Sequence, residues 1–266
     1  MGVNVNDITI TSLETITAFD IATGELKWIL DELQNAKIAN TQEKTDIAGK
    51  QGRKLTSLKK NKAVTISGSH GLVSGGLMAT QVGGKFKNGV TDIVYPDYIT
   101  VSSNKATTTY KAVGTTGNEI AAIYILNADG TRTTVEQGAS ATEGKFAYDP
   151  KTKEITFASG AVADGTEILA YYHRKISANY LENMSDNYSE KAMLYIDAFG
   201  EDKCSNVYHV QFYIPKADFE GNFDIDMGDN QTVHSFEAQS LTGGCGLKNG
   251  MLWRYTIFGE DTEDAA

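Results

Sequence analysis

Three aspartates in the last fifth of the chain have the composition of a calcium loop. Asp224, Asp226 and Asp229 occur in FEGNFDIDMGDNQTVHSFEAQSL, residues 219–241. An EF-hand loop needs oxygen ligands at positions 1, 3 and 5, glycine at 6 and a bidentate glutamate at 12. Counted from Asp224, position 5 is a glycine, position 6 is Asp229 and position 12 is Ser235, so the register fails at three places.

The same stretch fits a bent β-hairpin. Read with period two, Phe223, Ile225 and Met227 share one face, and Asp224 and Asp226 share the other. The tripeptide GDN tolerates positive φ, and an extended pattern resumes after it. We therefore predict a hairpin here and no metal site, with a weak calcium site at the three aspartates as the alternative.

The sequence has no recognisable catalytic constellation. Two cysteines lack metal or redox spacing, and the four histidines are far apart, without an HExxH motif: Cys204, Cys245, His70, His173, His209 and His234. A GxSxG elbow and a GxxxxGK[ST] phosphate loop are also missing. Tyr171, Tyr172 and Tyr213 could form a sugar-binding platform, but tyrosines of a β-rich chain more often pack sheet faces. We expect no enzyme activity, no catalytic or cofactor-binding residue and no cofactor.

Charge is distributed unevenly along the 266 residues. Residues 1–88, 89–175 and 176–266 carry net charges of +3, −2 and −11. The basic charge of the first part is concentrated in residues 44–62, which hold seven bases and one acid: Lys44, Lys50, Arg53, Lys54, Lys59, Lys60 and Lys62. No aromatic residue is interleaved for base stacking, which argues against nucleic-acid binding. The segment fits the acidic surface of another copy of the chain in a head-to-tail contact, with a solvated lysine-rich loop as the alternative.

One amphipathic segment precedes a strand-rich chain. Leu26, Ile29, Leu30 and Leu33 follow helical spacing, and Thr23 is a candidate N-cap, so the pattern predicts a helix over residues 24–37. Seven short extended runs separated by turns predict a small immunoglobulin-like β-sandwich at residues 89–175. Five candidate strands follow it. We expect one discontinuous domain, residues 1–88 and 176–266, with residues 89–175 as an inserted domain.

Composition is that of a folded soluble protein. Hydrophobic residues make up 41% and charged residues 22% of the chain. No apolar run reaches the length of a membrane span, and the first residues do not resemble a signal peptide. We expect synthesis in the cytoplasm and no membrane insertion.

The order of these segments resembles the tail-tube, or major tail, proteins of tailed bacteriophages. The segments that carry the likeness are NAKIANTQEKTDIAGKQGRKLTSLKKNKAVTISGSHGLVSGG, the strands after it, and the late stretch quoted above. The likeness covers residues 20–88 and 176–258. It implies a mainly β fold, a two-sheet antiparallel barrel or sandwich with one flanking helix, here residues 24–37. Insertion of an immunoglobulin-like module is common in phage structural proteins.

The resemblance also implies a function. Six copies would close into a ring through sheet edges, and rings would stack through a long loop, here residues 40–62, into a tube that DNA traverses. The expected location is the virion tail, with tape measure, tail terminator and baseplate proteins as partners and genomic DNA passing without sequence-specific binding. An acidic wall suits that passage, since DNA carries about one negative charge per 1.7 Å. The alternative function is a capsid decoration or adhesin-like β-module that grips a surface.

Overall fold

The protein consists of two compact units. A computed structural model describes residues 7–127, 129–227, 233–242 and 250–259. Unit 1 comprises the described parts of residues 1–86 and 181–266, and unit 2 comprises Lys87–Tyr180. Each unit has its own sheet and its own core.

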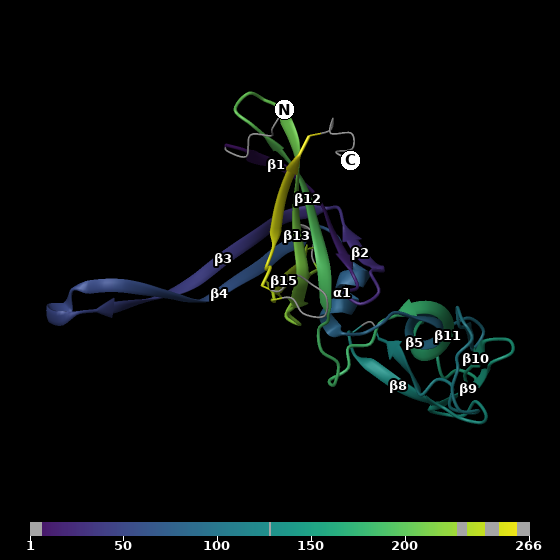
Figure 1. Ribbon diagram of the computed structural model, residues 1–266. Coiled ribbons are helices and arrows are strands. Elements are labelled where there is room, and N and C mark those ends of the chain that lie inside the picture. The colour runs from purple at the N-terminus through teal and green to yellow at the C-terminus, as the bar shows by residue number, and fades with distance from the viewer. Residues whose placement is uncertain (1–6, 128, 228–232, 243–249, 260–266) are drawn as a thin grey trace. The chain divides into compact units, whose positions relative to one another are not determined.

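Unit 1 is built on one curled sheet of nine strands (Figure 1). The hydrogen-bonded order is β2-β1-β12-β13-β15-β4-β3, with β14 paired to β15 and β16 paired to β13. The strands are β1 Thr9–Phe19, β2 Leu26–Leu30, β3 Leu33–Ala48, β4 Lys54–His70, β12 Lys191–Glu201, β13 Val207–Phe219, β14 Ile225–Asp226, β15 Val233–Ser240 and β16 Arg254–Phe258. All their pairings are antiparallel.

The core of unit 1 lies on one face of this sheet. Alternate residues of neighbouring strands point inward, as in β12, where Ala192, Leu194 and Ile196 are buried. Trp28 closes the core, packing edge-on against Phe219 with ring centroids 5.7 Å apart. Its indole nitrogen donates a hydrogen bond to the Thr80 hydroxyl at 2.9 Å, so the polar end of this buried ring is satisfied.

The helix predicted over residues 24–37 is wrong. That segment forms β2 and the start of β3, and β2 pairs with β1 in the register Ile16 to Leu30. Trp28 and Leu30 are buried while Ile29 is exposed, which is the alternation of a strand. Thr23 caps no helix, because it lies in a turn whose backbone donates to the Asp20 carboxylate. Sheet pairing and the burial of Trp28 therefore override the helical spacing of the leucines.

The α-helix of the described residues is α1, Gly75–Val82, which follows β4. Ser74 caps its first turn, its hydroxyl accepting from the Leu77 amide at 3.4 Å. The helix ends at Gly83, which has φ +64°. Added Cβ atoms there would lie 1.9 Å from the Tyr188 carbonyl oxygen, so this position requires glycine.

Unit 2 contains a seven-stranded sheet in the order β5-β11-β7-β8-β9-β10-β6. Its strands are β5 Lys87–Thr100, β6 Lys105–Thr107, β7 Ala122–Leu126, β8 Arg132–Gln137, β9 Lys145–Asp149, β10 Glu154–Thr156 and β11 Glu167–Tyr180. The short β8–β9 pair is parallel, and the other pairs are antiparallel. Its core includes Ile123, Phe146, Ile155, Ile168 and Tyr172. The immunoglobulin-like assignment of this unit stays a prediction.

The mainly β fold class is confirmed, with two largely antiparallel sheets. The one flanking helix is α1 instead of residues 24–37. In the part of the chain that the structure describes, no helix is long and apolar enough to cross a membrane.

Candidate assembly surfaces

β3 and β4 continue beyond the sheet as a long two-stranded hairpin (Figure 1). β4 pairs with β15 only from Val64 to His70, so residues 41–63 pair only with one another. We call residues 41–63 the hairpin arm. Apart from two half-buried residues, every residue of the arm is exposed.

The long loop predicted at residues 40–62 is therefore a β-hairpin. Its two strands satisfy each other's backbone groups from Thr41 paired with Ala63 to Ala48 paired with Lys54. A short 3₁₀ turn, Lys50–Gly52, joins them, with Gln51 and Gly52 at positive φ. The sequence signal for these two strands is the alternation of threonine, isoleucine and leucine along both halves of the segment.

All seven predicted contact residues lie on the arm. They are exposed and occur along its length and at its tip: Lys44, Lys50, Arg53, Lys54, Lys59, Lys60 and Lys62. Lys44 and Lys59 are cross-strand partners, an arrangement that is unfavourable in the isolated hairpin because like charges face each other. Lys54 forms an ion pair with Asp46 at 2.7 Å. The Lys54 ammonium and then the Ser57 hydroxyl lower the pKa of Asp46 below its usual value.

The arm has two chemically different faces. Strand pairing places Lys44, Asp46, Ser57 and Lys59 on one face. The opposite face carries Glu43 and Lys60 near the body and then an uncharged strip: Thr45, Ile47, Thr56 and Leu58. Ile47 and Leu58 are 39% and 56% exposed, and Leu55 near the tip is 68% exposed. This apolar strip was not predicted from the sequence, because it depends on the register in which the two strands pair.

Charge separates the arm from the rest of unit 1. The arm carries seven bases and two acids. The other described residues of unit 1 carry seven bases and seventeen acids. A basic projection and an acidic body on one chain are complementary between copies.

Several described strands have a partner on one side only. The sheet of unit 1 ends at β2 and β3, and β16 pairs only with β13. Leu26 and Ile29 are exposed on β2, and Tyr255 and Phe258 are exposed on β16. A row of unpaired backbone groups beside apolar side chains is a template for another strand.

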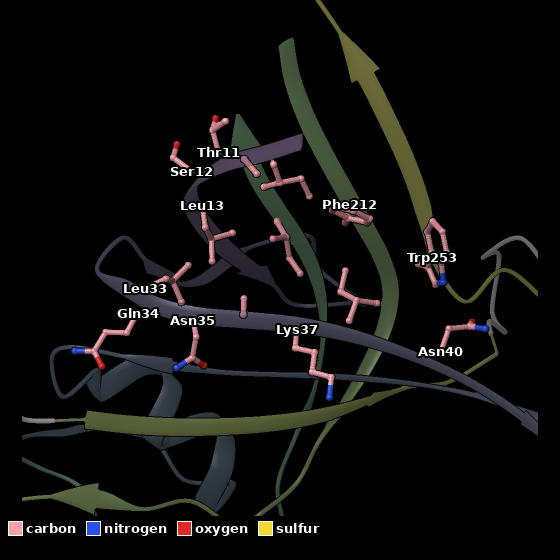
Figure 2. A pocket seen from close by; sticks show the side chains of 15 residues that line it. Thr11, Ser12, Leu13, Leu33, Gln34, Asn35, Lys37, Asn40, Phe212 and Trp253 are labelled. Atoms are coloured by element: carbon pink, nitrogen blue, oxygen red, sulfur yellow. The ribbon is translucent and has the colours of Figure 1, made fainter. Parts of the chain in front are cut away.

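A groove of about 590 Å³ opens where the sheet curls (Figure 2). β1 contributes Leu13, β3 contributes Leu33 and Lys37, and Phe212 and Trp253 form the opposite wall. The lining contains no histidine, cysteine, aspartate or glutamate. Its only ionisable side chain among the described lining residues is Lys37, beside apolar and uncharged polar residues, so its lining resembles a packing surface.

The described residues around Asp224 and Asp226 do not form a cluster of calcium ligands. β14 and β15 pair antiparallel, Ile225 with His234 and Asp226 with Val233, so both strands of the predicted hairpin are present. The Asp224 amide donates to the Ser235 hydroxyl at 2.9 Å. Asp229 lies outside the described residues. Within those residues, no group of three histidine, cysteine, aspartate or glutamate side chains could hold a metal ion.

The other singled-out residues are dispersed. His70 and His234 are cross-strand partners on β4 and β15, while His173 is in unit 2. Tyr171 and Tyr172 point to opposite faces of β11, so these two tyrosines do not share a platform, and Tyr213 is on β13 of unit 1. Cys204 is exposed and Cys245 lies outside the described residues.

Comparison with known proteins places the chain in a family. A family model described as the YomU/Tube protein family matches residues 8–255, a range that includes the hairpin arm and all of unit 2. No curated protein matches the chain.

Proposed function

The chain belongs to the YomU/Tube protein family, a name that indicates a structural tube protein of phages, and from this premise we propose that it assembles into stacked hexameric rings. These rings form the phage tail tube, the conduit for DNA delivery. The observation that carries the proposal is the hairpin arm, a folded and exposed projection whose charge is opposite to that of the body. A monomer gains little from such an element, since its ladder is solvated on both faces.

The arm is proposed as the contact between rings. Its seven bases, led by Lys44 and Lys59, meet the acidic body of a copy in the next ring. That contact relieves the Lys44 and Lys59 repulsion, because each gains an acidic partner. Arm and body are different surfaces, so the contact is head-to-tail and repeats without limit along an axis.

Closure within a ring is proposed to use the strand edges. Each copy pairs one edge with each of its two neighbours, so a closed ring covers two of the open sides at β2, β3 and β16 on every copy. Burying Leu26 and Ile29 at the same time adds an apolar contribution.

A tail tube implies further partners in the virion. We propose tape measure, tail terminator and baseplate proteins as partners in the virion, and DNA as a passenger that is not bound. The acidic body suits this passage, because a wall of like charge does not hold the phosphate backbone.

Removing the arm tests the proposal. Replacing residues 42–62 by Asn-Gly joins Thr41 to Ala63 through a two-residue hairpin turn and leaves the core intact. Negative-stain electron microscopy of the unaltered protein is expected to show tubes of uniform width, and of the variant, rings or single copies with native circular dichroism. Tubes formed equally well without the arm contradict the ring-to-ring role. Dispersed small particles from the unaltered protein favour the alternative, a capsid decoration or adhesin-like module.

A charge variant separates the basic residues from the fold of the arm. Lys59→Gln with Lys60→Gln is expected to raise the concentration needed for assembly about tenfold, since each interfacial ion pair contributes up to about 1 kcal/mol. Lys145→Gln with Lys151→Gln makes the same charge change on exposed residues of unit 2. Equal effects of the two pairs, measured by sedimentation, indicate that net charge alone governs assembly.

A further inference from the structure

Arg174 on β11 is held between two tyrosine rings. Its guanidinium carbon lies 3.6 Å from the centroid of Tyr110 and 5.3 Å from that of Tyr95. The two rings are perpendicular to each other, with centroids 5.0 Å apart. Stacking against aromatic faces fixes the plane of the guanidinium, so its fork of donors has a defined direction.

This guanidinium lacks a hydrogen-bond acceptor among the described residues. Its Nε atom is buried and has no partner, and no ion pair joins Arg174 to a carboxylate. The buried carboxylate of this region, Asp97, is already occupied, because it accepts from the Thr109 amide and hydroxyl and from the Tyr172 hydroxyl. Donors that are buried without a partner are uncommon and call for a ligand or another explanation.

Arg174 lines an open pocket of about 580 Å³ that carries further positive charge. Lys111 and Lys175 also line it, beside Tyr110 and the backbone of Gly114. One acid is present, Glu119, whose carboxylate accepts from the Gly117 amide at 3.0 Å and the Gln137 amide at 2.7 Å. Three cationic residues thus line one cavity, against a single carboxylate that is already hydrogen-bonded.

We propose that this cavity, the Arg174 pocket, is a binding site for an oxyanion, a carboxylate or a phosphate group carried by an external ligand. The guanidinium supplies a planar fork that matches two oxygens of such a group, and the two lysines supply flanking charge. Because the tyrosines already hold Arg174 in place, little side-chain entropy is lost on binding. The pocket lies within unit 2, so the proposal is independent of tube assembly.

Calorimetric titration of the full chain distinguishes the sources of the oxyanion. Inorganic phosphate and glucuronate are titrated at constant ionic strength, with glucose as the neutral comparison. Saturable binding of phosphate or glucuronate with Kd below about 1 mM, and none of glucose, is the expected result. Binding of one acid alone assigns the oxyanion as phosphate or carboxylate. The absence of saturable binding of both overturns the proposal.

Matched variants locate the binding. Arg174→Lys keeps the charge and removes the fork, and is expected to weaken binding at least about tenfold. Arg132→Lys makes the same change at an exposed position of β8 outside the pocket and is expected to leave binding unchanged. Equal loss in both variants overturns the assignment. If Arg174→Lys unfolds unit 2, Lys111→Gln with Lys175→Gln decides, because these changes leave the stacked arginine in place.

Discussion

His234 illustrates how one buried residue ties the helix to the sheet. Its side chain is fully buried on β15. The Gln81 amide nitrogen donates to the Ser235 carbonyl at 2.9 Å, which turns the Gln81 amide oxygen toward His234 Nε2 at 2.8 Å. The network therefore assigns the proton to Nε2, and Nδ1 accepts from the Ser74 amide at 3.3 Å. Both contacts lie on or beside α1, so the neutral imidazole holds the helix to β15.

Acid is expected to weaken this arrangement. Burial first, and then the facing His70, lower the pKa of His234 from its usual 6.5. The unfolded chain binds a proton that the folded chain does not, so the stabilisation is complete above about pH 6.5 and is lost as pH falls below it. Asp31, whose carboxylate lies 3.7 Å from His70 Nε2, is the acid next to the pair.

Urea unfolding at pH 7.5 and pH 5.0 measures the effect. The free energy of unfolding is expected to fall with pH by at most about 1.4 kcal/mol per unit for this one group. His234→Gln is expected to reduce the change in unfolding free energy between the two pH values, even if the variant is less stable at both. His173→Gln, at an exposed position, should keep the original slope. An unchanged slope in His234→Gln contradicts the assignment.

At the scale of elements, the end of α1 requires a residue at position 83 that can adopt positive φ. Gly83 and Gly24 both have positive φ, but only Gly83 is crowded, by the Tyr188 backbone. Gly24→Ala is expected to cost about 1 kcal/mol, the strain of the left-handed conformation. Gly83→Ala adds a backbone clash and is expected to cost about 3 kcal/mol or more. Thermal unfolding of the two variants compares them directly, and equal losses contradict the role assigned to the Tyr188 contact.

The sequence predicted strands far better than it predicted the helix. Alternation in β12 and β15 is regular because one face of each is buried. In β13 the buried positions change phase at Ile214 and Pro215, next to an irregularity in its pairing with β12. Residues 26–33 mislead because their leucines satisfy helical spacing, whereas pairing of β2 with the preceding strand β1 decides their conformation. The short helix α1 begins with two glycines, so its sequence gives only a weak helical signal. Its position depends on hydrogen bonds to Trp28 and His234, which are too far away in the sequence to appear in any local pattern.

For the candidate surfaces too, the sequence showed the charged residues but not the contacts that depend on the fold. The seven bases of the arm could be chosen from composition alone. The apolar strip on the opposite face could not be, because it requires the register that pairs Thr45 with Leu58 and Ile47 with Thr56. Likewise, Arg174 gave no signal in sequence, since its significance lies in Tyr95, Tyr110 and the missing acceptor.

On the scale of the whole molecule, the two units have separate cores, and no buried residue of one cluster belongs to the other unit. We predict that unit 2 is an insertion that can be removed. Replacing residues 88–179 by Asn-Gly joins Lys87 to Tyr180, which are already cross-strand partners. The remainder is expected to unfold cooperatively with a Tm within about 5 °C of the unit 1 transition in the full chain. An aggregated or unfolded remainder contradicts these boundaries.

The pairing of Lys87 with Tyr180 has a consequence for engineering. The chain enters and leaves unit 2 through two adjacent strands, whose paired Cα atoms are about 5 Å apart. Any passenger domain whose own ends lie equally close could be grafted there without stretching the host. A filament grown from such chimaeras would then carry one cargo per subunit at a fixed repeat, a regular scaffold for displaying antigens or enzymes.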